Sequence, residues 1–282
     1  MTWRIVREQV LLLVSGRTIL LETAHPFVGR AVADHSRFAN DPFGRARRTF
    51  NAVEEIVFGD LDTALASARR VRRIHNMVTG KLPGQAGRFA PGTDYDANQQ
   101  EGLLWVFATL IEGAVFAYEL LVRELAPEEK ERYYQESKLF AYCFGIEPET
   151  LPETWHDFYA YNVGMWYSDA LHVDDAAKLI ATQLLGAPHF ALEPAARFGK
   201  TVTGVLLPEP VREQYGMPAG AAERALARGV IEWGRAWHPM LPAHLRFGPA
   251  YLNAQWRLKG RRGQDPLARS VERVFYPWRQ AA

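Results

Sequence analysis

The stretch LLWVFATLIEGAVFAYELL, residues 103–121, decides the fold class of this chain, because it is apolar around nearly the whole circumference of a helix. It lies within a proline-free segment, residues 97–124, that has the length of a long helix. A helix with apolar residues on most sides is buried on most sides. We therefore expect residues 97–124 to form the central helix of a core.

Helical patterns continue on both sides of this segment. Asp41 and Pro42 are typical of an N-cap and a first helical residue, and they predict a helix that reaches Val57. A second helix is expected from Leu61 to Gly80. Further helices are expected over residues 127–145, 152–167, 174–185, 194–206 and 219–237. The Gly- and Pro-rich residues 81–96 are predicted to form a long loop. With no run of alternating strand residues, the predicted class is all-α, a multi-helix bundle.

The composition excludes several classes of function. The 282 residues include 33 basic and 32 acidic side chains, so bulk charge does not favour nucleic-acid binding. The single cysteine, Cys143, excludes an intrachain disulfide framework and any cysteine-built zinc or iron–sulfur site. Its aromatic neighbours favour a buried, inert thiol. The basic residues 257–263 are interpreted as a solvated charge cluster.

The N-terminal residues do not have the pattern of a targeting or membrane-spanning segment. Their longest apolar run, Val10 to Val14, is far shorter than the roughly 20 residues that span a bilayer. We expect a soluble, cytoplasmic protein without a transmembrane segment. Its amphipathic start, with Trp3 among basic residues, is also compatible with a peripheral membrane contact.

Two Glu-x-x-His pairs, Glu22/His25 and Glu153/His156, have the spacing of di-iron ligands on helices. The context is against a di-iron site, because only some twenty residues precede Glu22 and leave no room for an earlier glutamate-bearing helix. Glu153 follows Pro152 and is explained by helix capping. A di-iron protein stays an alternative interpretation.

Two other groups of residues are candidates for chemistry. His75 falls on the apolar stripe of its expected helix, with Arg72 one turn before it, and periodicity alone favours a core histidine. Arg45, Arg48 and Thr49 fall on one helical face, opposite the Phe43/Phe50 stripe. They are either a solvated cationic face or donors aimed at an anion or a bound oxygen species.

Six motifs follow one another along the chain, LLETAHPFVGRAVADHSRF (20–38), DPFGRARRTFNAVEEIVFGD (41–60), ARRVRRIHNMVTG (68–80), LLWVFATL (103–110), ERYYQE (131–136) and LPETW (151–155). In this order they resemble the family of oxygenase MpaB-like and latex clearing (rubber oxygenase) proteins, over roughly residues 10–240. The resemblance implies an all-α bundle with a globin-like core that binds haem b and cleaves carbon–carbon double bonds with O₂. We expect residues 1–245 to be the catalytic domain and 246–282 an extension packed on it.

The resemblance also implies roles for single residues. His75 matches the proximal ligand of haem iron and Arg72 the arginine one turn earlier, so His75 would be the metal ligand and both would bind the cofactor. Arg45 and Thr49 match polar residues of the distal side, and Arg45 would also contact the haem. Arg48 stands where rubber-cleaving members have lysine, which puts a lysine-capped iron in doubt.

Three further residues complete the comparison. Phe107 replaces a histidine that is common in the family, and it would make the pocket more apolar. His25 and His35 are interpreted as structural neighbours. Trp105, Phe107 and Phe116, with the aromatic segment 155–167, would form the walls of a substrate cavity.

The sequence therefore predicts a haem b-dependent oxygenase that uses O₂ on an apolar or aromatic small molecule. Two alternatives remain open at this point. One is a haem-binding sensor or carrier without turnover, and the other is the di-iron or metal-free helical protein. The oligomeric state is not predicted.

Overall fold

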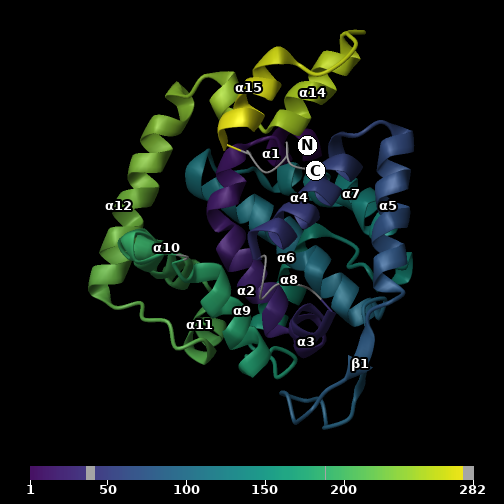
Figure 1. Ribbon diagram of the computed structural model, residues 1–282, viewed down its shortest axis with the longest axis vertical. Coiled ribbons are helices and arrows are strands. Elements are labelled where there is room, and N and C mark those ends of the chain that lie inside the picture. The colour runs from purple at the N-terminus through teal and green to yellow at the C-terminus, as the bar shows by residue number, and fades with distance from the viewer. Residues whose placement is uncertain (36–41, 188, 276–282) are drawn as a thin grey trace.

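The computed structural model describes residues 1–35, 42–187 and 189–275, with all their side chains except those of residues 42–47, 190 and 273–275. The described elements are helices apart from one two-stranded sheet, which confirms the all-α class (Figure 1). The elements are α1 (Thr2–Val6), η1 (Gln9–Val14), α2 (Ser15–Ala24), α3 (Pro26–His35), α4 (Pro42–Phe58), α5 (Leu61–His75), β1 (Thr79–Lys81), β2 (Asp94–Asp96), α6 (Gln100–Leu121), α7 (Pro127–Phe144), η3 (Pro148–Thr150), α8 (Trp155–Trp166), α9 (Asp175–Leu185), η4 (Phe190–Leu192), α10 (Glu193–Leu206), α11 (Glu209–Gln214), α12 (Ala221–Trp237), η5 (His238–Met240), α13 (Ala243–Arg246), α14 (Pro249–Leu258) and α15 (Pro266–Phe275).

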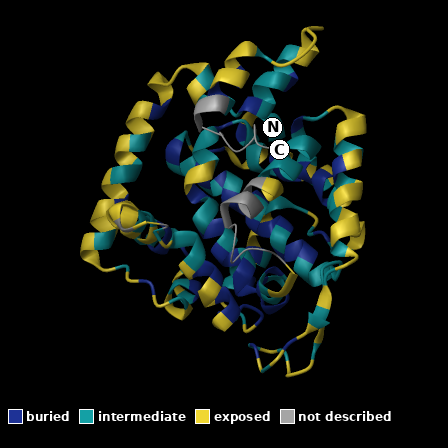
Figure 2. Cartoon of the chain, in the orientation of Figure 1, coloured by how far each residue is buried: buried dark blue, intermediate teal, exposed yellow. Residues whose placement is uncertain are grey.

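Helix α6 is the centre of the molecule, as its apolar sequence predicts. It packs against η1, α2, α7, α8 and α12, and the buried residues of the chain gather around it (Figure 2). The Trp105 indole is fully buried, and its Nε1 donates to the carbonyl of Leu21 at 2.8 Å. Among the described helices, α6 alone is long and apolar enough to cross a membrane, and two thirds of its apolar window is buried within the protein.

Local capping signals fix several helix ends. Asp60 caps α5 by accepting a hydrogen bond from the backbone N–H of Thr63. Gly145, at a φ of 94°, ends α7 in the left-handed conformation that glycine adopts without strain. Helix α8 begins at Trp155 and not at Pro152, because Thr154 and Asp157 form a reciprocal capping box there.

The expected helix from Leu61 to Gly80 is wrong at its end, since α5 stops at His75. Residues after it enter an antiparallel hairpin in which Thr79 pairs with Asp96 and Lys81 with Asp94, so residues 81–96 are not a structureless loop. The hairpin is fixed by its contact with α3. Tyr95 is buried and donates to Asp34 at 2.8 Å, and burial followed by this bond raises its pKa to about 12.

The C-terminal elements pack on the rest of the protein. Helix α14 packs on α4 and α15, and Arg257 donates to the carbonyl of Phe58 at 2.7 Å. Just before α14, the backbone N–H of Gly248 donates to the carbonyl of Arg7 at 2.8 Å. The domain boundary after residue 245 and the globin-like arrangement of the core stay predictions.

Candidate functional site

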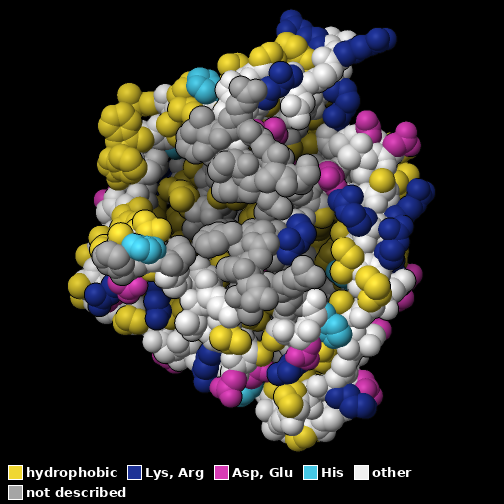
Figure 3. Space-filling model, in the orientation of Figure 1, with side chains coloured by type: hydrophobic (Ala, Val, Ile, Leu, Met, Phe, Trp, Pro, Cys, Tyr) yellow, Lys and Arg dark blue, Asp and Glu magenta, His cyan; other side chains and the backbone are white. Residues whose placement is uncertain are grey.

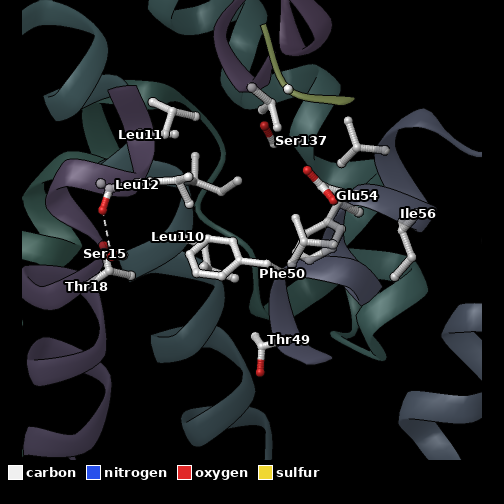
Figure 4. Close-up of a pocket in the computed structure, with 18 of the residues that line it drawn as sticks. Leu11, Leu12, Ser15, Thr18, Thr49, Phe50, Glu54, Ile56, Leu110 and Ser137 are labelled. Carbon is white, nitrogen blue, oxygen red and sulfur yellow. Dashed lines mark hydrogen bonds between the residues drawn. The ribbon is translucent and has the colours of Figure 1, made fainter. Parts of the chain in front are cut away.

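A large apolar cavity of about 1010 Å³ lies beside α6. Its wall is built by α1, η1, α2, α4, α6 and α7, with single residues from α3, α9 and the segment before α14. Figure 4 shows Phe50 of α4 beside Leu110 of α6, with Leu11 and Leu12 of η1 above them in the view. A cavity of this size is at the upper end of the range for sites that bind small molecules or cofactors.

The surface of this cavity is mostly apolar, although polar side chains are among its lining residues. Ser15 donates to the carbonyl of Leu12 at 2.7 Å and Ser137 to that of Tyr133 at 2.7 Å, so both hydroxyls already serve the backbone. Thr49 and Glu54 of α4 are among the lining residues, and Figure 4 shows Thr49 below Phe50 with its hydroxyl directed away from that ring. An apolar ligand is therefore held by contact area, and α4 supplies polar groups that can orient it.

The residues predicted for the distal side lie on α4, and the structure separates them. Thr49 lines the cavity together with Phe50, although Thr49 is exposed and Phe50 is half-buried. Consecutive residues of a helix are only about 100° apart, and one wide cavity can take both. Arg48 is exposed and is not among the described lining residues. The side chain of Arg45 lies outside the described residues.

The predicted distal and proximal residues lie on two helices, α4 and α5, that are in contact. The two helices pack on each other after the turn at Gly59 and Asp60. Arg45 and His75 are each fifteen residues from Asp60 along the chain, on the two helices that the turn joins.

His75 is half-buried at the end of α5 and does not belong to the described cavity lining. Its ring meets the edge of Phe144 at 5.5 Å between centroids, and its Nδ1 atom is shielded from solvent. Phe144 stacks on Phe140 at 5.9 Å, and Phe140 lines the cavity. Two phenyl rings thus connect the imidazole to the cavity. Arg72 is exposed, with its guanidinium beside Gly145.

The aromatic residues expected to form the cavity wall do not do so. Phe107 is fully buried, 6.4 Å from Phe140 and 6.1 Å from Phe158 between ring centroids, and it lies one layer behind the cavity. Trp105, Phe116 and the aromatic residues of α8 are also absent from the described lining. Helix α6 turns Leu110, Ile111, Gly113 and Ala114 toward the cavity instead, a choice that its nearly all-apolar sequence does not reveal.

The histidines interpreted as structural lie away from the cavity. His25 is fully buried with its Nε2 3.3 Å from Glu101, and this contact is the main cause that holds the pKa of Glu101 below its usual range. His35 bonds through Nε2 to the carbonyl of Thr79 at 2.9 Å and to the hydroxyl of Tyr95 at 3.2 Å.

The structure does not assemble the two Glu-x-x-His pairs. Glu22 lines the cavity, whereas His25 turns to Glu101 and His156 is 93% exposed. Among the described residues, the structure has no group of three or more His, Cys, Asp or Glu side chains that could coordinate a metal ion. That finding does not bear on a haem iron held by one histidine.

Two residues at the cavity were not predicted as part of a site. Cys143, expected to be buried and inert, is half-buried and lines the cavity. Glu8 is a wall residue that accepts from Arg246 at 2.8 and 2.9 Å and lies 3.0 Å from Nε2 of His238. More than 200 residues separate Glu8 from these partners, so no local pattern in the sequence could have indicated the cluster.

Comparison with known proteins gives one match. The profile of the family described as ER-bound oxygenase mpaB/B'/Rubber oxygenase, catalytic domain, matches residues 3–236. No curated protein and no solved structure matches the chain. The profile spans most of the sequence. It includes helices α4, α5 and α6 and most of the residues that line the apolar cavity. This chain therefore belongs to the mpaB/rubber oxygenase catalytic domain family and is an oxygenase.

Proposed function

We propose that this oxygenase binds haem b through His75 and uses O₂ to oxidise an apolar or aromatic small molecule, with cleavage of a C=C bond as one outcome. What supports the proposal is the family match, together with a large apolar cavity whose described lining includes Thr49 of α4.

The residues present fit a haem. A half-buried imidazole with an apolar aromatic neighbour is a suitable axial ligand, because the neutral ring binds iron while the surroundings limit the access of water. Arg72 is exposed, which suits an ion pair with the carboxylates at the edge of the macrocycle. His75 would hold the iron, and Arg72 and Arg45 would contact the propionates. When bound, haem iron supplies the redox chemistry with O₂.

The chain's own residues bind and orient the substrate. The walls contributed by η1, α4 and α6 desolvate an apolar molecule and exclude bulk water from it. Thr49 is one of the lining residues whose hydroxyl can orient a polar atom in this space, whereas the hydroxyls of Ser15 and Ser137 bond to backbone carbonyls. These contacts favour apolar or aromatic molecules over charged ones.

Absorption spectroscopy on the purified full-length protein tests the haem assignment. After haem supplementation we expect an intense Soret band in the wild type and in the control His156→Ala, whose imidazole is exposed. The folded His75→Ala variant should lose the band or bind haem much more weakly. Normal haem occupancy and an unchanged ferric spectrum in His75→Ala would contradict the proposal.

Turnover tests the substrate class. A panel of apolar alkenes and phenols, incubated with the haem-loaded protein under O₂, should give products whose intact masses show oxygen incorporation. Omission of O₂ is the control. If haem binds and every member of the panel is recovered unchanged, the proposed substrate class is wrong.

A further inference from the structure

Helix α12 lies at the edge of the molecule and packs only a narrow stripe inward. Of its 17 residues, Ala227 is the one that is fully buried. The outward surface carries Leu226, Trp233 and Trp237, at a spacing that places them on one flank of the helix. Trp233 is 66% exposed and Trp237 is 49% exposed. Figure 3 shows hydrophobic side chains gathered along the edge where α12 lies.

This flank forms an apolar groove with α10. Phe198 of α10 faces Leu226, Val230 and Trp233 of α12 across a hollow of about 610 Å³. Leu192 before α10 and Met240 after α12 extend the exposed apolar area. We call the exposed residues Leu192, Phe198, Leu226, Trp233, Trp237 and Met240 the α10–α12 apolar surface. Large apolar patches of this kind on a folded protein mark a surface that something covers.

The charges next to this surface indicate what covers it. Arg224, Arg228 and Arg235 lie on the opposite outward flank of α12, so the helix is amphipathic in the manner of helices that lie in a membrane interface. Arg197 and Lys200 flank Phe198 on α10. Together α10 and α12 carry five cationic side chains against three carboxylates.

Several of these cations have no carboxylate partner of their own. Among the described residues, Arg197, Lys200 and Arg228 take part in no ion pair, whereas many other surface arginines do, Arg132 with Glu136 for example. A second copy of the chain docked on this surface would bring the same cations together, which is unfavourable. An anionic lipid surface would neutralise them and also accept the tryptophans at headgroup level.

The apolar surface continues toward the cavity. Leu241 and Leu245 follow Met240, and both are exposed. Helix α13, which contains Leu245, packs on η1. In η1, Leu12 lines the cavity and its neighbour Leu13 is 63% exposed. Exposed apolar side chains therefore follow the chain from the end of α12 to α13, which contacts the η1 wall of the cavity.

We propose that the α10–α12 apolar surface docks this protein on membranes that contain anionic lipids, with Trp233 and Trp237 inserted at the level of the headgroups. The inference does not depend on haem or on the identity of the substrate. It describes peripheral binding, in which α12 lies in the interface and α6 stays in the protein core.

Flotation with lipid vesicles tests the proposal on the full-length protein, with and without added haem. The wild type should float with phosphatidylcholine vesicles that contain phosphatidylglycerol, and less with pure phosphatidylcholine. The double variant Trp233→Gln/Trp237→Gln should lose at least about tenfold in partitioning, because two rings no longer leave water. The matched control is Leu61→Gln, which changes a 72% exposed side chain on α5, across the molecule from α12.

A charge variant separates the two contributions. Arg197→Gln/Arg228→Gln should reduce the preference for anionic vesicles and make binding less sensitive to salt between about 0.1 and 1 M. Circular dichroism checks that every variant is folded, and the substituted side chains are exposed. The proposal is overturned if the wild type floats with neither vesicle, or if the tryptophan variant floats as the wild type does. It is also overturned if sedimentation shows a homodimer that Trp233→Gln/Trp237→Gln dissociates.

Discussion

Arg17 of α2 and Glu112 of α6 form a bidentate ion pair inside the protein. Nη1 of Arg17 donates to Oε2 of Glu112 at 2.6 Å and Nη2 donates to Oε1 at 3.0 Å, with both side chains buried. Nε of Arg17 also donates to the carbonyl of Leu206 at 2.9 Å, and the guanidinium lies over the ring of Phe116. The pair joins α2, α6 and the end of α10 next to the cavity wall formed by Thr18 and Gly113.

Arg17→Met should lower the free energy of unfolding by about 3–5 kcal/mol, because the carboxylate of Glu112 is left buried without its partner. Replacing both residues by methionine should recover most of the loss, since a buried ion pair and well-packed apolar side chains are often similar in stability. Urea denaturation of the three proteins measures this. A single variant as stable as the wild type would show that Glu112 finds solvent or another partner.

His238 should make stability depend on pH. Burial lowers the pKa of its imidazole, Arg246 acts in the same direction, and Glu8 acts against them. The folded protein therefore disfavours the protonated ring, whereas the unfolded chain binds the proton near pH 6.5. The contribution of His238 to stability is present above about pH 6.5 and is lost as the pH falls through the lowered pKa.

The measurement is urea unfolding of His238→Gln and wild type between about pH 7 and 5, where ordinary carboxylates stay ionised. The variant should lose less stability than the wild type on acidification. His156→Gln removes an exposed imidazole and should keep the wild-type slope. Parallel slopes for His238→Gln and wild type would contradict the role of His238.

Phe107→Ala should lower the free energy of unfolding by about 3–5 kcal/mol, because the fully buried ring fills the space between Phe140 and Phe158. Phe107→His places a polar ring in that space and should also be less stable than the wild type. Since position 107 lies behind the cavity, neither variant should change the spectrum of bound haem. A pH-dependent spectral change near 6.5 in Phe107→His would show that position 107 faces the cofactor.

Thr49→Val should keep the haem content and slow turnover, because it removes a cavity hydroxyl while keeping the shape of the side chain. Loss of one oriented donor typically costs about 100-fold or more in rate. Thr182→Val, on α9 and exposed, is the control. Haem content and product formation are measured on the same preparations. If Thr49→Val turns over at the wild-type rate, the Thr49 hydroxyl does not contribute to turnover.

The sequence alone predicts those features that depend on neighbouring residues. The burial of α6 follows from its apolar circumference, and the start of α5 follows from the Asp60 cap. The ordered motifs also predict the family that the profile match then establishes. That Thr49 and His75 belong to helices is local in the same sense, whereas the end of α5 at His75 is not, because the expected helix continues to Gly80.

Other features depend on residues far apart in the chain, and only the tertiary structure decides them. A hairpin replaces the end of the second expected helix because Tyr95 is buried against α3. The same long-range packing decides which side of α6 meets the cavity and which side buries Phe107. Periodicity fixes where a side chain points around its own helix, but not which neighbour it meets there. For that reason the ion pair of Arg17 with Glu112, the Glu8–His238 contact and the exposed tryptophans of α12 become visible only in the folded protein.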